Sequence, residues 1–162
     1  MKQLLIVRHA KSSWAIPGQD DFERPLNDRG HRDAPMMAER LLDKKIEVNA
    51  FISSPANRAL TTATYLAKAY GLHKKDIHLF KELYHAAPAS FYAVIGKTDS
   101  AIKTAAVFSH NPGITSFVNE LTATKIDNMP TCGIFAVRAD IKNWAEFTTA
   151  EKTFWFFDYP KR

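Results

Sequence analysis

Short apolar runs alternate with stretches of helical periodicity along this sequence. The strand-like runs are residues 3–8, 50–53, 77–80, 105–109 and 132–138. Alternation of this kind is typical of a largely parallel sheet that helices cover. At 162 residues, of which 46% are hydrophobic, the chain is expected to form one α/β domain, residues 1–162, with a sizeable core. An aromatic run at 154–157 is either a last strand or a tail packed on the surface.

The first helix has two candidate starting points. Alanine, methionine and leucine recur at helical spacing between Ala34 and Leu42. Asn27 is a suitable N-cap, but Pro35 would then interrupt the hydrogen bonds inside the helix. A later start near Pro35 is therefore the alternative.

Two later helices are marked by a cap residue followed by a proline. Ser54 can cap a helix in which Pro55 takes the first position and Gly71 ends the last turn. Asn111 and Pro112 repeat the same pattern further along the chain. Both helices follow strands, so each is expected to begin where a strand ends.

Histidine and arginine side chains stand where the strands end. Arg8 and His9 follow the first strand, His110 follows the fourth, and Arg58 lies in the first turn of the helix after the second. One such histidine is more often a surface residue, and an isolated arginine more often pairs with a surface carboxylate. Here three strand ends agree, at the edge where open parallel sheets bind ligands.

These residue types suit phosphoryl transfer. Arginine forks match phosphate oxygens, and catalysis of this reaction is mainly positioning and charge stabilisation. Nearby guanidinium groups also keep a histidine neutral, as it must be to attack phosphorus. From the residues alone, either His9 or His110 can be the nucleophile.

A long loop leaves directly from His9. Residues 11–27 show no sustained periodicity and contain turn-forming pairs such as Pro17-Gly18. Loops longer than about 12 to 15 residues are often functional, so this one is expected to border the site. Disorder is the alternative.

Charge and cysteine content narrow the range of functions. The 22 Lys and Arg outnumber the 17 Asp and Glu, which favours anionic ligands, but they are scattered, so no nucleic-acid partner is expected. Cys132 is the single cysteine and the histidines lack metal-ligand spacing, which predicts no metal and no other cofactor. The apolar run before Arg8 is too short for a signal peptide or a membrane span. A cytoplasmic protein without membrane contact is expected.

Seven segments resemble motifs of the histidine phosphatase (phosphoglycerate mutase-like) superfamily, and more closely those of the short SixA-type phosphohistidine phosphatases. The segments are Arg8-His9-Ala10-Lys11-Ser12-Ser13-Trp14, Arg24-Pro25-Leu26-Asn27, Arg32-Asp33-Ala34-Pro35, Ser53-Ser54-Pro55, Arg58-Ala59, Glu82-Leu83-Tyr84 and His110-Asn111-Pro112-Gly113. They cover most of residues 1–120. The resemblance implies a three-layer αβα sandwich with a mostly parallel central sheet, phosphoglycerate mutase-like, in a minimal version without large helical insertions.

The resemblance also implies a role for each site residue. His9 becomes phosphorylated, Arg8 and Arg58 bind the phosphate, and His110 completes the pocket as a further catalytic residue. Glu82 matches the position from which longer relatives supply a proton. A solvated carboxylate at a strand end is the alternative for Glu82.

Two positions depart from the family pattern. Ala10 stands where glycine is usual, which requires a negative φ and room for one methyl group. Ala15 stands where the mutase branch has a phosphate-binding asparagine. That difference leaves Ser12 as the candidate for an additional phosphate contact.

The length of the chain separates the candidate substrates. Only residues 85–90 lie between Glu82 and the next helical pattern, so the pocket is expected to be shallow and open to a side chain displayed by another protein. A phosphorylated imidazole also leaves with little proton assistance. The expected function is metal-independent removal of phosphate from phosphohistidine in a protein, such as a phosphotransfer or carrier domain. A phosphomonoesterase acting on a small phosphate ester, or a non-catalytic phosphate-binding module, is the alternative.

Overall fold

The computed structural model describes residues 1–161, which form one six-stranded sheet, four α-helices and four short 3-10 helices. The strands are β1 (Lys2–Arg8), β2 (Ala50–Ser53), β3 (His78–Leu79), β4 (Thr104–Ser109), β5 (Ile134–Ala139) and β6 (Thr153–Asp158). Their order across the sheet is β3-β2-β4-β1-β5-β6. The strands β3, β2, β4 and β1 are parallel to one another, while β5 runs antiparallel to β1 and β6 antiparallel to β5. The mostly parallel sheet is confirmed, and the aromatic run at 154–157 belongs to a last strand.

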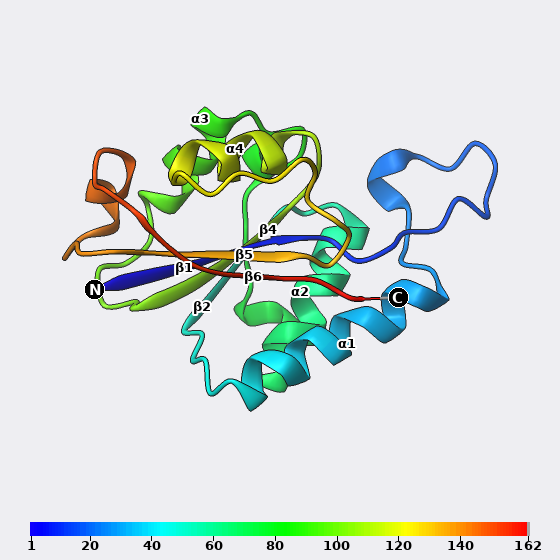
Figure 1. Ribbon diagram of the computed structural model, residues 1–162. Helices are drawn as coiled ribbons and strands as arrows, with labels where there is room; N and C mark the ends of the chain where they lie inside the picture. The colour runs from blue at the N-terminus through cyan, green and yellow to red at the C-terminus, as the bar shows by residue number, and fades with distance from the viewer. Residues whose placement is uncertain (162) are drawn as a thin grey trace.

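Helices cover both faces of the sheet, as the sequence predicted. The four α-helices are α1 (Asp28–Asp43), α2 (Asn57–Ala69), α3 (Pro88–Ile95) and α4 (Gly113–Leu121), and the short ones are η1 (Asp21–Glu23), η2 (Lys74–Asp76), η3 (Lys81–Leu83) and η4 (Trp144–Thr148). In Figure 1, α1 and α2 lie below the sheet and α3 and α4 above it. The three-layer αβα arrangement is therefore confirmed, without a large helical insertion in residues 1–161.

The central strands are apolar because both of their faces are buried. In β1, Leu4 and Ile6 belong to the core under α3 and α4, while Leu5 and Val7 belong to the core over α1 and α2. Successive side chains of a strand point to opposite faces, so this four-residue run fills both cores. The ends of β1 and β4 are thereby fixed next to each other, with Arg8 opposite Ser109.

The helix starts decide between the alternatives that the sequence left open. The backbone N–H of Gly30 donates to Asn27 Oδ1 at 2.9 Å, so α1 has the earlier start and contains Pro35. The sequence placed the next start two residues too early, because Ser54 Oγ accepts from the N–H of Ala56 at 3.2 Å outside the helix.

Two further boundaries correct the sequence-based prediction. Asn111 does not cap α4, because its amide donates to Asn128 Oδ1 at 2.9 Å and Pro112 takes the cap position. The fifth strand begins at Ile134 rather than at residue 132, since Cys132 has a φ of 58°. A side chain in this left-handed region cannot continue a strand.

Within residues 1–161, no helix combines the length and the apolar character needed to cross a membrane.

Candidate active site

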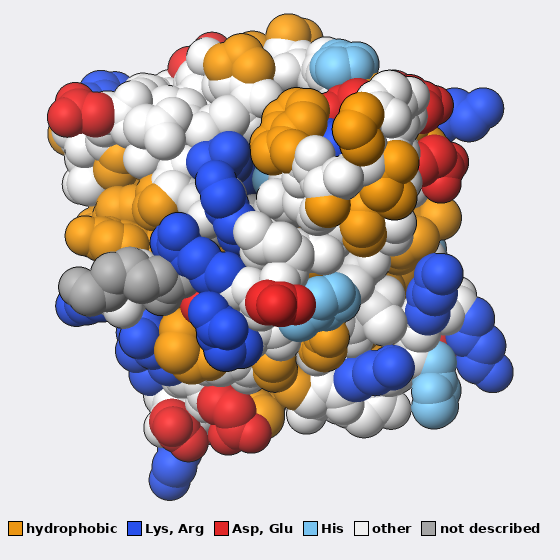
Figure 2. Space-filling model, turned by 90° about the vertical axis from the view of Figure 1, so that its right-hand side faces the viewer, with side chains coloured by type: hydrophobic (Ala, Val, Ile, Leu, Met, Phe, Trp, Pro, Cys, Tyr) orange, Lys and Arg blue, Asp and Glu red, His pale blue; other side chains and the backbone are white. Residues whose placement is uncertain are grey.

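A pocket of about 420 Å³ lies at the edge of the sheet where β1 and β4 end. The structure brings five of the six predicted site residues to it, namely Arg8, His9, Ser12, Arg58 and His110. The long loop also borders it, as expected, and contributes Lys11, Ser12, Trp14, Asp21 and Arg24. Figure 2 views this face and shows Lys and Arg side chains gathered in a band with hydrophobic side chains beside them.

His9 is buried and neutral. Its Nδ1 lies 2.7 Å from the carbonyl oxygen of Ala10, which can only accept, so Nδ1 carries the proton and Nε2 keeps its lone pair. Burial, and after it the charges of Arg8, Arg58 and Arg24, lower the pKa of His9 to about 3 against the opposing effect of that hydrogen bond. The imidazole is therefore uncharged at neutral pH.

Ala10 is accommodated in the way that its size requires. Its φ is not positive, its side chain is fully buried, and its N–H donates to Thr62 Oγ1 at 2.9 Å. The two conditions set for replacing glycine at this position are met.

His110 faces His9 across the pocket, with ring centroids 5.2 Å apart. Its Nε2 lies 2.8 Å from Ser54 Oγ. Burial, followed by the neighbouring His9 and Arg58, lowers the pKa of His110 to about 2. His110 is thus neutral as well, and its hydroxyl partner holds the ring in place.

Three buried nitrogens of this pocket lack a hydrogen-bond partner among the described residues: Arg8 Nε, Arg58 Nε and His110 Nδ1. Leaving buried polar groups unpaired is costly. Two of these atoms are cationic N–H donors, so the described lining of the pocket combines positive charge with unpaired donors, which favours an anionic ligand.

Asp21 is a site residue that the sequence did not reveal. Its Oδ2 accepts from Tyr84 Oη at 2.6 Å and from Arg58 Nη2 at 3.0 Å, and its Oδ1 accepts from Arg24 Nε at 3.1 Å. Partial burial alone would raise the pKa of Asp21, but these three donors outweigh it and hold the pKa well below its usual range. Asp21 is a carboxylate at neutral pH and orients both arginines.

Arg24 was also missed as a functional residue, although it lies in one of the recognised segments. It is 7% exposed and donates through Nη1 to Ser12 Oγ at 2.7 Å. Ser12 therefore supports Arg24 as well as lining the pocket. A signal was present in the sequence: Arg24 lies in the loop that was expected to border the site.

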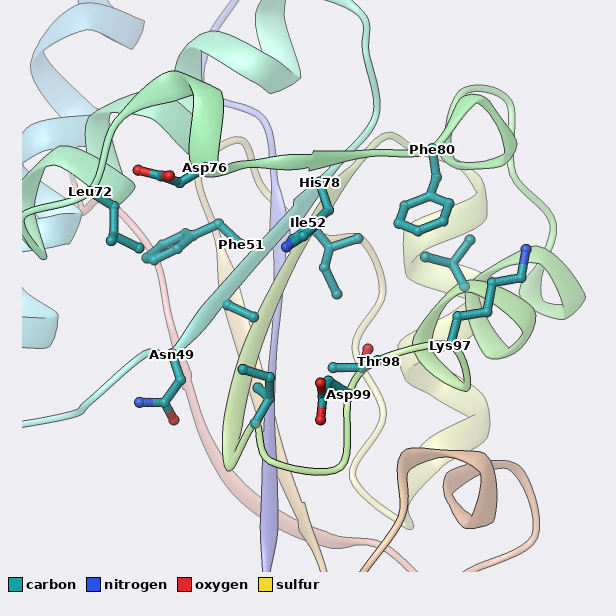
Figure 3. A pocket seen from close by; sticks show the side chains of 13 residues that line it. Asn49, Phe51, Ile52, Leu72, Asp76, His78, Phe80, Lys97, Thr98 and Asp99 are labelled. Carbon is teal, nitrogen blue, oxygen red and sulfur yellow. The ribbon is translucent and has the colours of Figure 1, made fainter.

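Glu82 is the predicted site residue that the structure does not bring to the pocket. Its Oε2 lies 3.8 Å from Lys97 Nζ, and both side chains are more than half exposed. Lys97 lines a different cavity of about 510 Å³ beside β2 and β3, where Figure 3 shows it below Phe80. The position of Glu82 fits the alternative of a solvated carboxylate, and its proposed role as proton donor has no support in the geometry.

The structure also bears on the expectation of no metal. Among residues 1–161, His, Cys, Asp and Glu side chains form no group of three that could hold a metal ion. Whether the reaction needs a metal remains a prediction, which a chelator tests.

The two buried histidines predict that stability depends on pH. The ordinary pKa of a histidine is near 6.5, whereas the pKa is lowered to about 3 in His9 and to about 2 in His110. Below pH 6.5 these two histidines bind protons in the unfolded chain but not in the folded one. Each unit by which the pH is lowered therefore reduces the free energy of unfolding by up to about 1.4 kcal/mol for each histidine. Urea denaturation between about pH 7 and pH 5 measures this slope.

The variant His9→Asn is expected to reduce the dependence of the unfolding free energy on pH by the contribution of one histidine, up to about 1.4 kcal/mol per pH unit. His31, an exposed histidine whose Nδ1 lies 2.7 Å from Tyr65 Oη, supplies the control variant His31→Asn. A slope unchanged by His9→Asn, or flattened equally by His31→Asn, contradicts the prediction.

Comparison with known proteins agrees with this geometry. The family model of the histidine phosphatase superfamily (branch 1) matches residues 4–87. An uncharacterized chloroplastic protein of Arabidopsis thaliana is 26% identical over 153 residues, covering 90% of this chain and 70% of the relative. Phosphoserine phosphatase 1 of Hydrogenobacter thermophilus is 33% identical over 84 residues, covering 51% of this chain and 36% of the relative.

Solved structures share the whole fold. A candidate phosphohistidine phosphatase SixA from Agrobacterium tumefaciens superposes with a TM-score of 0.83 at 24% identity, covering 99% of both chains. The protein histidine phosphatase SixA complexed with tungstate gives 0.77 at 23% identity, covering 97% of this chain and 96% of that one.

Fold and pocket together define a phosphatase with a histidine-centred site. The chain belongs to the histidine phosphatase superfamily, branch 1, and its compact fold is of the SixA type.

Proposed function

We propose that this protein is a metal-independent phosphatase that forms a phosphohistidine intermediate on His9 and removes phosphate from phosphohistidine in other proteins. The observation that carries the proposal is the neutral Nε2 of His9 in a pocket with unpaired nitrogens of Arg8, Arg58 and His110. The superfamily supports phosphatase activity. The choice of a protein substrate rests on the pocket and on the chemistry of the leaving group.

In the first half of the reaction, His9 Nε2 attacks the phosphorus of the bound phosphohistidine. A new N–P bond forms on His9, and the N–P bond of the substrate breaks. Its electron pair returns to the substrate ring, which carries a proton on its other nitrogen and therefore leaves as neutral imidazole. Arg8 and Arg58 hold the oxygens of the transferring group, where negative charge gathers in the transition state.

In the second half, water attacks the phosphorus of phospho-His9. A P–O bond forms, the N–P bond breaks, and His9 recovers its lone pair. The proton of the attacking water passes to solvent, while Asp21, which is ionised and lines the same pocket, orients the arginines that hold the phosphoryl oxygens. Tyr84 and Arg58 hold its Oδ2 in a fixed position. These donors keep the pKa of Asp21 too low for it to act as a base, so its role is to position Arg58 and Arg24.

The charge state of the pocket favours phosphohistidine over phosphate esters. An alkoxide leaving group needs a proton donor, whereas imidazole is a much weaker base and departs with less assistance. Within the described residues that line the pocket, the single carboxyl group is Asp21, and it is deprotonated. The site therefore suits a leaving group that requires no acid.

A small-molecule phosphomonoesterase is the second candidate function. It is favoured by the likeness to phosphoserine phosphatase 1, which is 33% identical over about half of this chain. It requires the same nucleophile and a proton donor for the alkoxide. A non-catalytic phosphate-binding module, the third alternative, would leave His9 unphosphorylated.

The deciding experiment compares catalytic efficiencies in the presence of a chelator. The substrates are a histidine-phosphorylated protein and a panel of small phosphate esters, with His9→Ala as background. A ratio strongly in favour of the protein supports the proposal. A low ratio with His9-dependent turnover moves the assignment to the phosphomonoesterase, and activity lost in chelator contradicts metal independence.

Replacing Asp21 tests its role directly. Asp21→Asn is expected to lower turnover of phosphohistidine by about 10²-fold, because the amide lacks the charge that holds Arg58 and Arg24 in position to bind the transferring phosphoryl group. Both half-reactions should slow, so rapid-quench measurements should show slower formation of phospho-His9 without its accumulation.

Glu82→Gln is the matched control for that variant, because it also converts a carboxylate to an amide, outside the pocket. It is expected to leave turnover within about twofold of wild type. Equal losses in the two variants, or loss in Glu82→Gln alone, would return the acid–base role to Glu82.

A further inference from the structure

Two large hydrophobic side chains stand exposed on the loop that borders the active site. Trp14 is 75% exposed and Ile16 is 57% exposed, which makes them, apart from Met1 at the chain end, the two most exposed large hydrophobic residues among those described. In Figure 1 this loop, coloured blue and following β1, projects beyond the sheet and its helices. Tryptophan is enriched among residues that dominate the binding energy of interfaces.

The exposed tryptophan is held in one position. The guanidinium carbon of Arg24 lies 3.6 Å from the centroid of its ring. Arg24 is itself fixed by Asp21, by Ser12 and by the carbonyl oxygen of Ser13. The ring is therefore stacked on a buried cation and presents its other face to solvent, which lowers the entropic cost of binding a partner.

The base of the loop is equally fixed. The N–H of Ser13 donates to the carbonyl of Pro25 at 2.8 Å, and the N–H of Asn27 donates to the carbonyl of Lys11 at 3.0 Å. A Cβ on Gly30 would collide with that same carbonyl of Lys11, so glycine allows α1 to pack directly against the loop. Trp14 and Ile16 are thus carried on a rigid support beside the catalytic pocket.

We infer that Trp14 and Ile16 form a docking surface for an acidic protein that presents its phosphohistidine to His9. The positive charge of the pocket favours a negatively charged partner. Among the described lining residues, four side chains are cationic and one is a carboxylate: Arg8, Lys11, Arg24 and Arg58 against Asp21. The whole chain carries a net charge of +5, and surfaces of opposite charge steer association. This inference rests on the proposed function.

Variants of Ile16 can test docking without changing the catalytic site, because Ile16 is not one of the residues that line the pocket. The test compares Ile16→Glu and Ile16→Lys on two substrates: a histidine-phosphorylated phosphotransfer domain of net negative charge, and phosphoramidate. On the domain, Ile16→Glu is expected to lower kcat/KM by about 10-fold or more, mainly through KM, and Ile16→Lys by less. On phosphoramidate both variants should match wild type.

Leu79→Glu is the control, because Leu79 is 48% exposed on β3 and should lose nothing on either substrate. Equal losses of Ile16→Glu on both substrates, unchanged turnover of the domain, or a larger loss for Ile16→Lys would each overturn the inference. So would conversion of a wild-type dimer to a monomer by Ile16→Glu in sedimentation, which would assign the surface to a second copy of the chain. Failure of the proposed function is separate: the wild type would then hydrolyse phosphoramidate but not the phosphorylated domain.

Discussion

His9→Ala is expected to lower kcat/KM for a histidine-phosphorylated protein by on the order of 10⁴-fold or more, as losses of a covalent nucleophile do in other enzymes. The variant removes a nitrogen that combines a free lone pair, a lowered pKa and adjacent arginines. No acid-labile phosphate should appear on the protein when substrate is mixed and quenched. Phosphate release and radiolabel retained after alkaline quenching measure the two effects.

His110→Ala distinguishes the two histidines of the site. Because the Nε2 of His110 is occupied by Ser54, we assign it to phosphate binding. This variant should therefore still form phospho-His9, at a reduced rate. Label retained by His9→Ala but lost in His110→Ala would reverse the assignment, and His31→Ala, outside the pocket, should behave as wild type.

The strand ends are the part of the site that the sequence predicted well. Arg8, His9 and His110 lie at the ends of β1 and β4. These two strands are apolar on both faces, so they pair with each other in the middle of the sheet, where both faces are buried. Arg58 follows from a helix start that was predicted two residues early. A shift of that size left its place at the sheet edge intact, because the first turn of a helix after a parallel strand returns to the same edge.

The loop contributions could not be predicted because they depend on contacts that are distant along the chain. Asp21 meets Tyr84 and Arg58, which lie 63 and 37 residues away. Residues 11–27 carry no periodicity that would place their side chains. The sequence therefore predicted that the loop borders the site, but not that it supplies a carboxylate and a third arginine.

The segment Glu82-Leu83-Tyr84 shows why the proton donor was misplaced. η3 buries Leu83 completely and turns Glu82 toward Lys97 in solvent. Tyr84, the third residue, then reaches Asp21 and lies with its ring 5.5 Å from that of His110. The segment does serve the site, through a phenol that holds the carboxylate instead of through a carboxylate of its own.

Arg58→Ala is expected to lower kcat/KM by about 10²- to 10³-fold, the usual loss when one donor to a developing anion is removed. Arg58 is 5% exposed, lines the pocket, donates to both Asp21 Oδ2 and the backbone oxygen of Asp21, and has an Nε without a hydrogen-bond partner. The variant removes a phosphate donor and one of the groups that position Asp21, so both half-reactions should slow. Arg58→Lys restores the charge but not the planar fork, and should recover only part of the loss.

Arg40→Ala provides the matched control for a general effect of losing an arginine–aspartate pair. Arg40 Nη1 lies 3.1 Å from Asp158 Oδ1, outside the pocket residues, nearly the same separation as the 3.0 Å between Arg58 Nη2 and Asp21 Oδ2. Inhibition by inorganic phosphate should weaken in Arg58→Ala and remain unchanged in Arg40→Ala. If both variants lost activity and phosphate affinity to the same extent, the loss would reflect a damaged fold; if Arg58→Ala bound phosphate as well as wild type, Arg58 would be a structural partner of Asp21 and not a phosphate ligand.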